Sequence, residues 1–403
     1  DSNAAILELS TIPQINFSGR LAYLIQYPHG CVEQTTSSVF PQLFLNDIFD
    51  LTSDKKKEIQ KNIENGIQRL GNFQKANGGL SYWMGENDVD DWGTSYAGHF
   101  LLEAEKKGFV LPLTFKSNFI EYQKKAARNW RQGYNTYSSD LEQAYRLYTL
   151  ALAANPDLSA MNRLREFKQI SNEAKWRLAA TYALVGQKEA SEKIMSSANL
   201  NFSGYKYYNY GSETRNRAMA LETMLLTNNK NTKDVAKSIA KELSSNNYMS
   251  TQTTAFSLLS IGKMVVKNGG KSIDIKFTNN GKSENIKTTS AFVQRTIKIK
   301  NGKNSITLKN NDNNIVFARI INTGKLPLGD EISESRGLSV SLKYTDLTGK
   351  IINIHQLKQG QDFVAKITVS NPKNETVKNI ALTQIFPSGW EIVNTRFTDF
   401  GST

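Results

Sequence analysis

Cysteine is nearly absent from this sequence, because its 403 residues include a single one, Cys31. One cysteine cannot form an internal disulfide bond, which excludes a fold stabilised by disulfide bonds. A lone cysteine is either a small buried hydrophobic residue or a thiol with a chemical use, and its neighbours in the sequence must distinguish the two.

Long apolar runs are also missing. No stretch of about twenty consecutive apolar residues occurs, so we expect no membrane-spanning helix. The sequence begins at Asp1 with neither an initiator methionine nor a signal-peptide pattern, which predicts a mature or excised piece of a longer protein. Hydrophobic residues make up 39% of the chain and are spread throughout, so we predict a globular chain of two or three domains.

Acidic residues are too few to balance the basic ones, and the net charge is +13. Such a charge is compatible with binding to nucleic acid or to an anionic surface. Between Lys267 and Lys309, however, basic residues alternate with Ile, Phe and Val, as on the solvated face of β-strands, and no nucleic-acid motif is present. We therefore expect no nucleic-acid partner.

The hydrophobic pattern changes near residue 265. Before this point apolar residues recur at helical spacing, as Ile59, Ile63, Ile67 and Leu70 do after a predicted cap at Ser53. Loops rich in Gly, Asn and Pro separate such stretches. This pattern predicts helical hairpins in a stacked or closed α/α array. Further helices are predicted over residues 94–104, 141–154, 172–185, 217–226 and 250–265.

After about residue 266 apolar and polar residues alternate, which is typical of β-strands. Residues 272–278 form the first predicted strand, and Asn279-Asn280-Gly281 forms its turn. Residues 323–334 are predicted to be a linker, and the spacing of the strands after it favours a β-sandwich. The other predicted strands are 296–300, 305–308, 316–321, 338–344, 362–369, 379–385 and 390–393.

The neighbours of Cys31 indicate a chemical use for its thiol. The local string is Tyr27-Pro28-His29-Gly30-Cys31-Val32-Glu33-Gln34-Thr35-Thr36-Ser37. In a tight turn or the first turn of a helix, side chains at positions i and i+3 lie on one face, which brings Cys31 beside Gln34. A thiolate there can attack the Gln34 carboxamide carbon, and loss of ammonia leaves an internal thioester, an acyl donor for an external nucleophile. The alternative is a buried structural cysteine with chance neighbours.

This string resembles the thioester signature Tyr-Pro-x-Gly-Cys-x-Glu-Gln-Thr-Thr-Ser of bacterial α2-macroglobulins, to which the thioester-containing complement proteins are related. Three other segments agree with the resemblance, which covers nearly the whole chain: Gly78-Gly79-Leu80-Ser81-Tyr82-Trp83, Trp92-Gly93-Thr94-Ser95-Tyr96-Ala97 and Ser250-Thr251-Gln252. The resemblance implies a multidomain α + β chain. An α/α-toroid thioester domain would span residues 1–265, the C-terminal part of a CUB-like β domain 266–330, and a C-terminally incomplete macroglobulin-like β-sandwich 331–403.

The same resemblance implies a broad-spectrum protease inhibitor that works as a single-use covalent trap, is not an enzyme, and needs neither a metal nor a cofactor. Cys31 and Gln34 would form the thioester, which acylates lysine amines of an attacking protease after bait cleavage elsewhere in the protein. Tyr27 matches a tyrosine that shields the thioester in bacterial members, and shielding is necessary because an exposed thioester hydrolyses. Those members also use a methionine of the C-terminal domain, but no methionine follows Met264 here.

Two further residues are supporting candidates. His29, beside the cysteine, either lowers the pKa of the thiol or packs in the turn. Glu33 either has only a structural role, favouring the helix start through the helix dipole, or a functional one that the sequence does not reveal. Some complement members direct the acyl group to hydroxyls with a histidine, but the corresponding stretch here, residues 134–140, contains none, and His99 is predicted to pack in a core. We therefore predict direct acylation of amines.

Two other functions remain open. Asp88-Val89-Asp90-Asp91 matches the acid motif of class II terpene cyclases, which also use α/α toroids. A surface adhesin would use the same thioester chemistry to attach to host tissue. The macroglobulin-like segments favour the trap over both.

Location and partners are implied by the resemblance alone. It points to a monomeric protein in the periplasm or cell envelope, held at the membrane by an N-terminal lipoprotein segment that this chain lacks. The partners would be target proteases, bound covalently through lysine, and a peptidoglycan synthase of the cell envelope.

Overall fold

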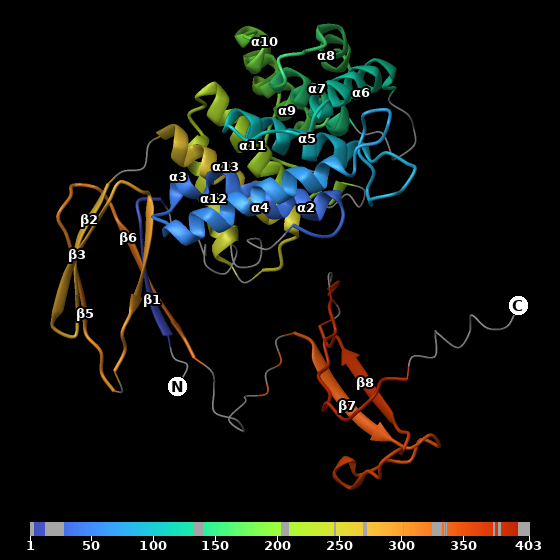
Figure 1. Ribbon diagram of the computed structural model, residues 1–403, viewed down its shortest axis with the longest axis vertical. Coiled ribbons are helices and arrows are strands. Elements are labelled where there is room, and N and C mark those ends of the chain that lie inside the picture. Colours follow the sequence, from blue (N-terminus) through green and yellow to red (C-terminus); the bar gives the residue numbers. More distant parts are fainter. Residues whose placement is uncertain are drawn as a thin grey trace, which may run out of the picture. The chain divides into compact units, whose positions relative to one another are not determined.

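The computed structural model describes residues 4–12, 28–131, 140–202, 209–245, 247–268, 272–300, 302–324, 333, 335, 337–373, 375–377 and 380–393. The chain divides into two compact units, residues 1–324 and 325–403. Unit 1 contains a helical part and two small sheets, and unit 2 contains a two-stranded sheet (Figure 1). None of the helices in the described ranges combines the length and the apolar character that a membrane crossing requires.

One set of helices surrounds the core of the helical part. Within the described ranges each helix of this set contacts the next, and the last contacts the first again. Every residue of α7 is buried, which is the pattern of a helix enclosed on all sides. In order, the set is α2 (Val32–Val39), α5 (Asp91–Lys106), α7 (Asp140–Leu152), α9 (Asn172–Leu184), α11 (Glu213–Thr227) and α13 (Thr251–Asn268).

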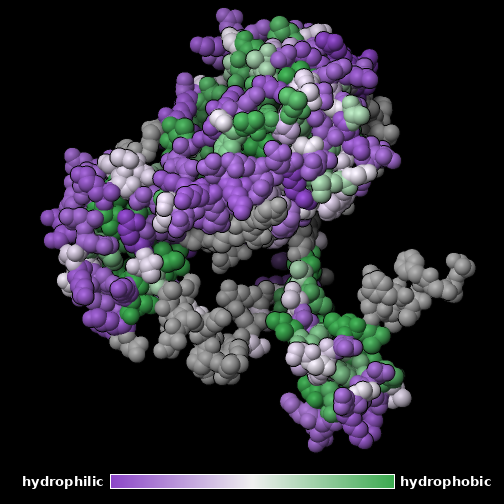
Figure 2. Space-filling view, in the orientation of Figure 1, coloured by the Kyte–Doolittle hydropathy of each residue, from purple (hydrophilic) through white to green (hydrophobic). Residues whose placement is uncertain are grey.

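A second set of helices packs against the outside of the first. These helices are amphipathic: α4 buries Ile59, Ile63, Ile67 and Leu70 and turns its lysines and acids to solvent. Figure 2 shows this hydrophilic surface over the helical part. The set is α4 (Ser53–Gly71), α6 (Phe115–Asn129), α8 (Leu158–Arg165), α10 (Lys188–Ser196) and α12 (Thr232–Ser244), and η1 (Pro41–Phe44) and α3 (Leu45–Ile48) connect α2 to α4.

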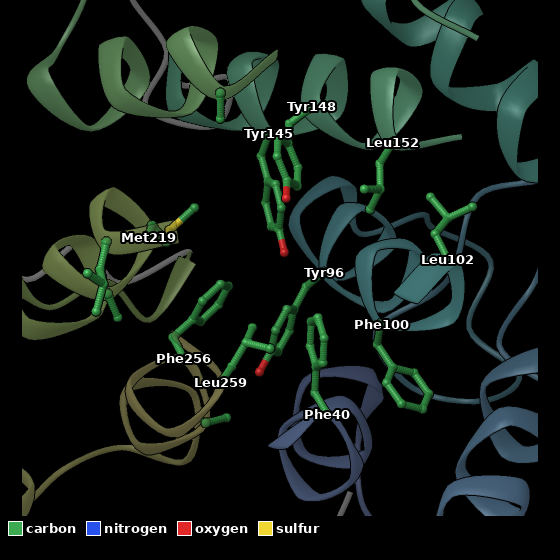
Figure 3. Packing of buried hydrophobic residues seen from close by; sticks show 14 of the residues in the cluster. Phe40, Tyr96, Phe100, Leu102, Tyr145, Tyr148, Leu152, Met219, Phe256 and Leu259 are labelled. Carbon is green, nitrogen blue, oxygen red and sulfur yellow. The ribbon is translucent and has the colours of Figure 1, made fainter. Parts of the chain in front are cut away.

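Aromatic side chains fill the centre of the helical part. Tyr96 of α5, Tyr145 of α7 and Phe256 of α13 point towards one another in Figure 3. The rings of Tyr96 and Phe256 are stacked with centroids 5.0 Å apart, and Phe40 lies 6.0 Å from Tyr96. Burial of each such ring contributes about 1.5–3 kcal/mol, so this cluster is a main source of stability.

The two sheets of unit 1 share a second core, separate from the helical one. Its apolar residues alternate along the strands, as in Ala5, Leu7 and Leu9 of β1 and Ile273 and Ile275 of β2. One sheet has the order β4-β1-β6 and the other β3-β2-β5. All pairs are antiparallel, and the strands are β1 (Ala4–Ser10), β2 (Ile273–Asn279), β3 (Lys282–Thr288), β4 (Phe292–Ile297), β5 (Ile306–Asn310) and β6 (Phe317–Thr323).

Strand β1 comes from the opposite end of the sequence to its neighbours. Leu7 lies opposite Arg295 of β4 and Ile320 of β6 in the antiparallel registers. Figure 1 shows β1 in the dark blue of the N-terminus beside the orange β6. The boundary predicted at residue 265 counted these residues with the helices, whereas the structure places them in the sandwich.

Unit 2 has a small antiparallel sheet of β7 (Ser339–Thr345) and β8 (Val364–Ser370), with a 3-10 helix η3 (Ile354–Gln356) between them. The strands predicted at 379–385 and 390–393 were wrong for the residues that the structure describes there, 380–385 and 390–393. The Trp390 N–H donates instead to the Pro387 carbonyl at 3.0 Å in a local turn, and the Trp390 ring packs on Phe363 with centroids 4.8 Å apart.

The predicted helices are confirmed, with ends shifted by a few residues. The cap of α4 is Thr52 rather than Ser53, because Thr52 Oγ1 accepts the N–H of Lys55 at 3.4 Å. The predicted turn after β2 is confirmed: Asn280 and Gly281 have φ of 48° and 86°, as a two-residue hairpin turn requires. The strand predicted at 296–300 lies instead at Phe292–Ile297.

Candidate thioester site

Cys31 is the N-cap of α2 and Gln34 lies in its first turn. The backbone N–H of Gln34 donates to Cys31 Sγ at 3.4 Å, and the Cys31 N–H donates to Gln34 Oε1 at 3.3 Å. This reciprocal arrangement is a capping box, in which two otherwise unpaired helix N–H groups find partners. The bonds that start the helix therefore also hold the thiol beside the carboxamide.

The turn before the cysteine needs a glycine. Gly30 has φ of +85°, and a Cβ on it would lie 2.1 Å from Gln34 Oε1, closer than any side chain tolerates. Arg69 of α4 fixes the same turn, because it donates to the Gly30 carbonyl at 2.8 Å and to Thr35 Oγ1 at 3.2 Å. The Gln34 carboxamide is thus packed against backbone that a helix from outside the ring holds in place.

Glu33 points away from this pair, into the helical core. Its carboxylate is buried and accepts hydrogen bonds from Ser37 Oγ at 2.7 Å and from Thr251 Oγ1 at 3.0 Å. Burial raises the pKa of Glu33, and these two hydrogen bonds act against the rise. The contacts link α2 to α13 and are consistent with the structural role considered for this residue.

Two tyrosines that the sequence did not single out lie near Cys31. The Tyr82 carbonyl accepts the N–H of Val32, the residue after the cysteine, at 3.0 Å. The hydroxyl of Tyr210 lies 2.5 Å from that of Tyr82, and the two rings are stacked with centroids 6.3 Å apart. Tyr82 lies within the segment similar to the family, but its spacing from Cys31 does not predict this contact.

The thiol is buried and protonated at neutral pH. Burial raises the pKa of Cys31, while the nearby Tyr82 hydroxyl and the hydrogen bond from the Gln34 N–H act in the opposite direction. The side chains of Gln34 and His29 are exposed, and the His29 carbonyl accepts from Thr35 Oγ1 at 3.4 Å. A role for His29 at the thiol stays a prediction, and Tyr27 lies outside the described residues.

The other residues considered from the sequence have structural partners. Asp90 caps α5 by accepting the N–H of Gly93 at 2.5 Å, and Asp91 forms an ion pair with Arg146 at 2.9 Å. His99 is fully buried in the helical core, as predicted. Across the described ranges, no group of His, Cys, Asp and Glu side chains is arranged to hold a metal ion.

A ring of helices, with a buried cysteine beside an exposed glutamine at the start of one of them, is the arrangement expected of a thioester domain. Residues 6–130 match the family model described as the A-macroglobulin TED domain. Nearly the whole chain is similar to bacterial alpha-2-macroglobulins.

Curated relatives match nearly the whole chain. The alpha-2-macroglobulin of Rickettsia conorii is 23% identical over 96% of this chain, and that of Xylella fastidiosa strain Temecula1 is 24% identical over 98%. The chain spans 21% and 25% of the length of these two proteins, respectively. The Escherichia coli protein is 34% identical over a shorter stretch, 26% of this chain and 7% of that protein.

Solved structures share the fold. Salmonella alpha-2-macroglobulin reacted with methylamine superposes with a TM-score of 0.66 and 21% identity, over 92% of this chain and 25% of that one. Native Escherichia coli alpha-2-macroglobulin from domain MG7 to the C-terminus superposes with a TM-score of 0.67 and 19% identity, over 92% of this chain and 60% of that one. The mixed helical and β architecture is therefore that of the C-terminal region of these proteins.

Proposed function

We propose that this chain is the thioester-bearing part of an alpha-2-macroglobulin-type protease trap, in which Cys31 and Gln34 form a single-use acyl donor. The observation that carries the proposal is the reciprocal hydrogen bonding of the two residues at the start of α2. It holds the thiol beside the carboxamide before any bond forms, so that thioester formation needs little reorganisation.

The chemistry proceeds in two stages. The Cys31 sulfur attacks the Gln34 side-chain carbonyl carbon, a C–S bond forms, and the amide nitrogen leaves as ammonia. Later an amine attacks the same carbon, an amide bond forms, the C–S bond breaks, and the thiol is released. The acceptor on a target protease is a lysine, and the Salmonella relative reacted with methylamine supports an amine as the nucleophile.

The domain architecture is part of the proposal. The closed order of contacts from α2 to α13 and back supports an α/α toroid. The pairing of β1 with β4 and β6 supports a CUB-like domain whose strands precede and follow the helical domain. Unit 2 would be the start of a macroglobulin-like domain. The domain boundaries at residues 265 and 330 stay predictions, with the exception that residues 4–10 are grouped with the sheets and not with the helices.

Shielding of the thioester is proposed to involve Tyr27. Burial of Cys31 supports storage of the bond, but the Gln34 side chain is exposed, so it needs cover from another part of the protein. A monomeric state, a periplasmic or cell-envelope location with a lipoprotein anchor, and a peptidoglycan synthase as partner remain proposals that rest on the resemblance. The alpha-2-macroglobulin relatives favour a trap over an adhesin or a terpene cyclase.

Intact mass before and after methylamine treatment tests the chemistry. The thioester form is one ammonia lighter than the sequence mass, and methylamine adds its own mass and frees the thiol of Cys31, the one cysteine in the sequence. Cys31→Ala is the control and should have its sequence mass with no change on treatment. A wild-type chain with its sequence mass and a free thiol from the start would contradict the proposal.

The choice of nucleophile has a separate test. Intact thioester should couple to methylamine faster than to glycerol, because no histidine occurs in residues 134–140 to activate a hydroxyl. Faster coupling to glycerol would show that the acceptor is a hydroxyl and that the prediction of lysine is wrong.

A further inference from the structure

One peptide group links Arg69 to the Gln34 carboxamide. The peptide bond between Gly30 and Cys31 carries the Gly30 carbonyl at one end and the Cys31 N–H at the other. Arg69 Nη2 donates to that carbonyl oxygen at 2.8 Å, and the Cys31 N–H donates to Gln34 Oε1 at 3.3 Å. The guanidinium, the peptide group and the carboxamide therefore form one continuous chain of hydrogen bonds.

The oxygen at the end of this chain stays on its carbon throughout the proposed chemistry. The amide nitrogen of Gln34 leaves when the thioester forms, whereas Oε1 becomes the carbonyl oxygen of the thioester. Attack on this carbon, first by sulfur and later by an amine, gives a tetrahedral intermediate in which Oε1 carries the negative charge. The Cys31 N–H is thus placed where charge develops in both stages.

The hydrogen bond from the Cys31 N–H to Oε1 has room to strengthen. At 3.3 Å it is longer than the usual length of about 2.7–3.2 Å for such bonds, so it contributes little while the oxygen is neutral. A hydrogen bond to a charged acceptor is shorter and about twice as strong. An interaction that is stronger in the transition state than in the ground state accelerates the reaction.

Arg69 has no carboxylate partner among the described residues. Its other contacts there are Thr35 Oγ1, which accepts from Nε at 3.2 Å, and the Phe73 ring, whose centroid lies 5.7 Å from the guanidinium carbon. Its positive charge, which no ion pair neutralises, therefore acts on the Gly30 carbonyl. A cation at this oxygen polarises the peptide group and makes its N–H a stronger donor, because hydrogen bonds in a chain strengthen one another by about 10–30% each.

We propose that the Cys31 N–H is the oxyanion donor for both stages, and that Arg69 is a positioning residue that holds and polarises the peptide group carrying this N–H. This inference rests on the proposed thioester function. During formation, sulfur bonds to the Gln34 carbonyl carbon, the C–N bond breaks, and ammonia leaves with the thiol proton. During opening, the amine nitrogen bonds to the same carbon, the C–S bond breaks with its electron pair on sulfur, and a proton passes from nitrogen to sulfur through solvent. In each step Oε1 holds the electron pair of the opened C=O bond until the leaving group departs.

Arg69→Met tests the proposal, because it removes the charge and both hydrogen bonds but keeps a long side chain. The rate of thiol release by methylamine is measured on the thioester-intact full chain. We expect Arg69→Met to react about tenfold more slowly. Loss of a whole oxyanion donor costs about a hundredfold to a thousandfold, and here the Cys31 N–H remains. Arg69→Lys keeps the charge and should lie between the two. Lys61→Met removes an exposed charge from the same helix and should match the wild type.

An infrared measurement separates polarisation of the peptide group from support of the turn. The protein is labelled with carbon-13 at the side-chain carbonyl of glutamine, and spectra are recorded before and after methylamine treatment. Their difference isolates the thioester carbonyl at Gln34. A weaker hydrogen bond to Oε1 leaves the C=O bond stiffer, so this band should lie at higher frequency in Arg69→Met than in the wild type. It should not move in Lys61→Met.

The outcomes separate this inference from the proposed function. A wild-type chain without a thioester contradicts the proposed function itself. If the wild type reacts and Arg69→Met reacts at the same rate or faster, the inference is overturned. A slower reaction without the shift of the carbonyl band to higher frequency also overturns it, because Arg69 would then only support the turn.

A folded Arg69→Met that forms no thioester leaves the decision to Arg69→Lys. A slower reaction of Arg69→Lys with a shifted carbonyl band supports the inference, and an unchanged reaction overturns it. Absence of the thioester from both folded variants also overturns it, because weaker polarisation slows bond formation and does not abolish it.

Discussion

The carboxylate of Glu33 accepts a hydrogen bond from Thr251, a residue 218 positions later in the chain. Thr251 Oγ1 lies 3.0 Å from one carboxylate oxygen and 3.1 Å from the other. Glu33 belongs to the first turn of α2, beside Cys31, and Thr251 begins α13. The contact therefore joins the first and last helices of the ring at the turn that carries the candidate thioester.

Removal of this carboxylate should destabilise the helical part. We expect Glu33→Ala to lower the free energy of unfolding by about 1–3 kcal/mol, because the buried Ser37 hydroxyl and the half-buried Thr251 hydroxyl lose their acceptor. Glu33→Gln keeps an acceptor oxygen and should cost less. Urea denaturation followed by far-UV circular dichroism measures both, with Glu64→Ala on the exposed face of α4 as the control. Equal effects of Glu33→Ala and Glu64→Ala would contradict the structural role.

Gly30→Ala should abolish or strongly reduce thioester formation. The added Cβ would lie 2.1 Å from Gln34 Oε1, which must displace the carboxamide from the thiol. Gly108→Ala is a matched control, because Gly108 has a similar φ of +92° but open space around it. Both variants carry a strain of about 1 kcal/mol, so only the clash differs. The methylamine-reactive fraction, measured by intact mass, should fall in Gly30→Ala alone, and a normal fraction there would contradict the expectation.

His99 should make the helical part less stable as the pH falls. Burial is the main cause that lowers the pKa of His99 to about 4, although Glu222 and Glu103 beside it act to raise it and Lys263 acts to lower it. The unfolded chain, with a histidine pKa of about 6.5, therefore binds this proton more readily than the folded one. The contribution of neutral His99 to the free energy of unfolding is fully present above the pKa that this histidine has in the unfolded chain. It is lost as the pH falls from 6.5 towards 4.

Between pH 7 and pH 5 this effect amounts to a loss of about 2 kcal/mol in the free energy of unfolding. His99→Gln cannot take up the proton and should lose much less over the same interval, while keeping a polar partner for the Tyr145 hydroxyl. Urea denaturation of both proteins at the two pH values measures the difference. Parallel losses in the two proteins would show that other groups are responsible.

Leu7→Ala should loosen the sandwich of unit 1. Leu7 is fully buried between the two sheets, and a Leu→Ala change in a core costs about 2–5 kcal/mol. Ile320→Ala is the control, since Ile320 lies opposite Leu7 in β6 but is 50% exposed. Hydrogen exchange should become faster in β4 and β6 of Leu7→Ala, and less so in α7. Unchanged exchange in β4 and β6 would mean that β1 contributes little to the sandwich.

Local features of this protein follow from the sequence. The spacing of Cys31 and Gln34 places both at one helix start, because the cap and its hydrogen bonds involve residues three positions apart. The apolar period of α4 and the Asn280-Gly281 turn are local in the same sense. Even at this local level the sequence does not determine which of two adjacent residues caps the helix. Thr52 and Ser53 are both able to cap α4, and in the structure Thr52 does so.

Contacts between distant segments were decided by the tertiary structure. The alternating apolar residues at positions 4–10 are typical of a strand but do not predict its partner strands. In the structure β1 pairs with β4 and β6, which lie almost three hundred residues later in the chain. The hydroxyls of Tyr82 and Tyr210, 128 residues apart in the sequence, meet only because the helices around them close into a ring. Periodicity reports which face of an element is apolar, whereas the partner of that face depends on how all the elements pack together. The Cys–Gln pair was therefore predictable from the sequence, and the groups that surround it were not.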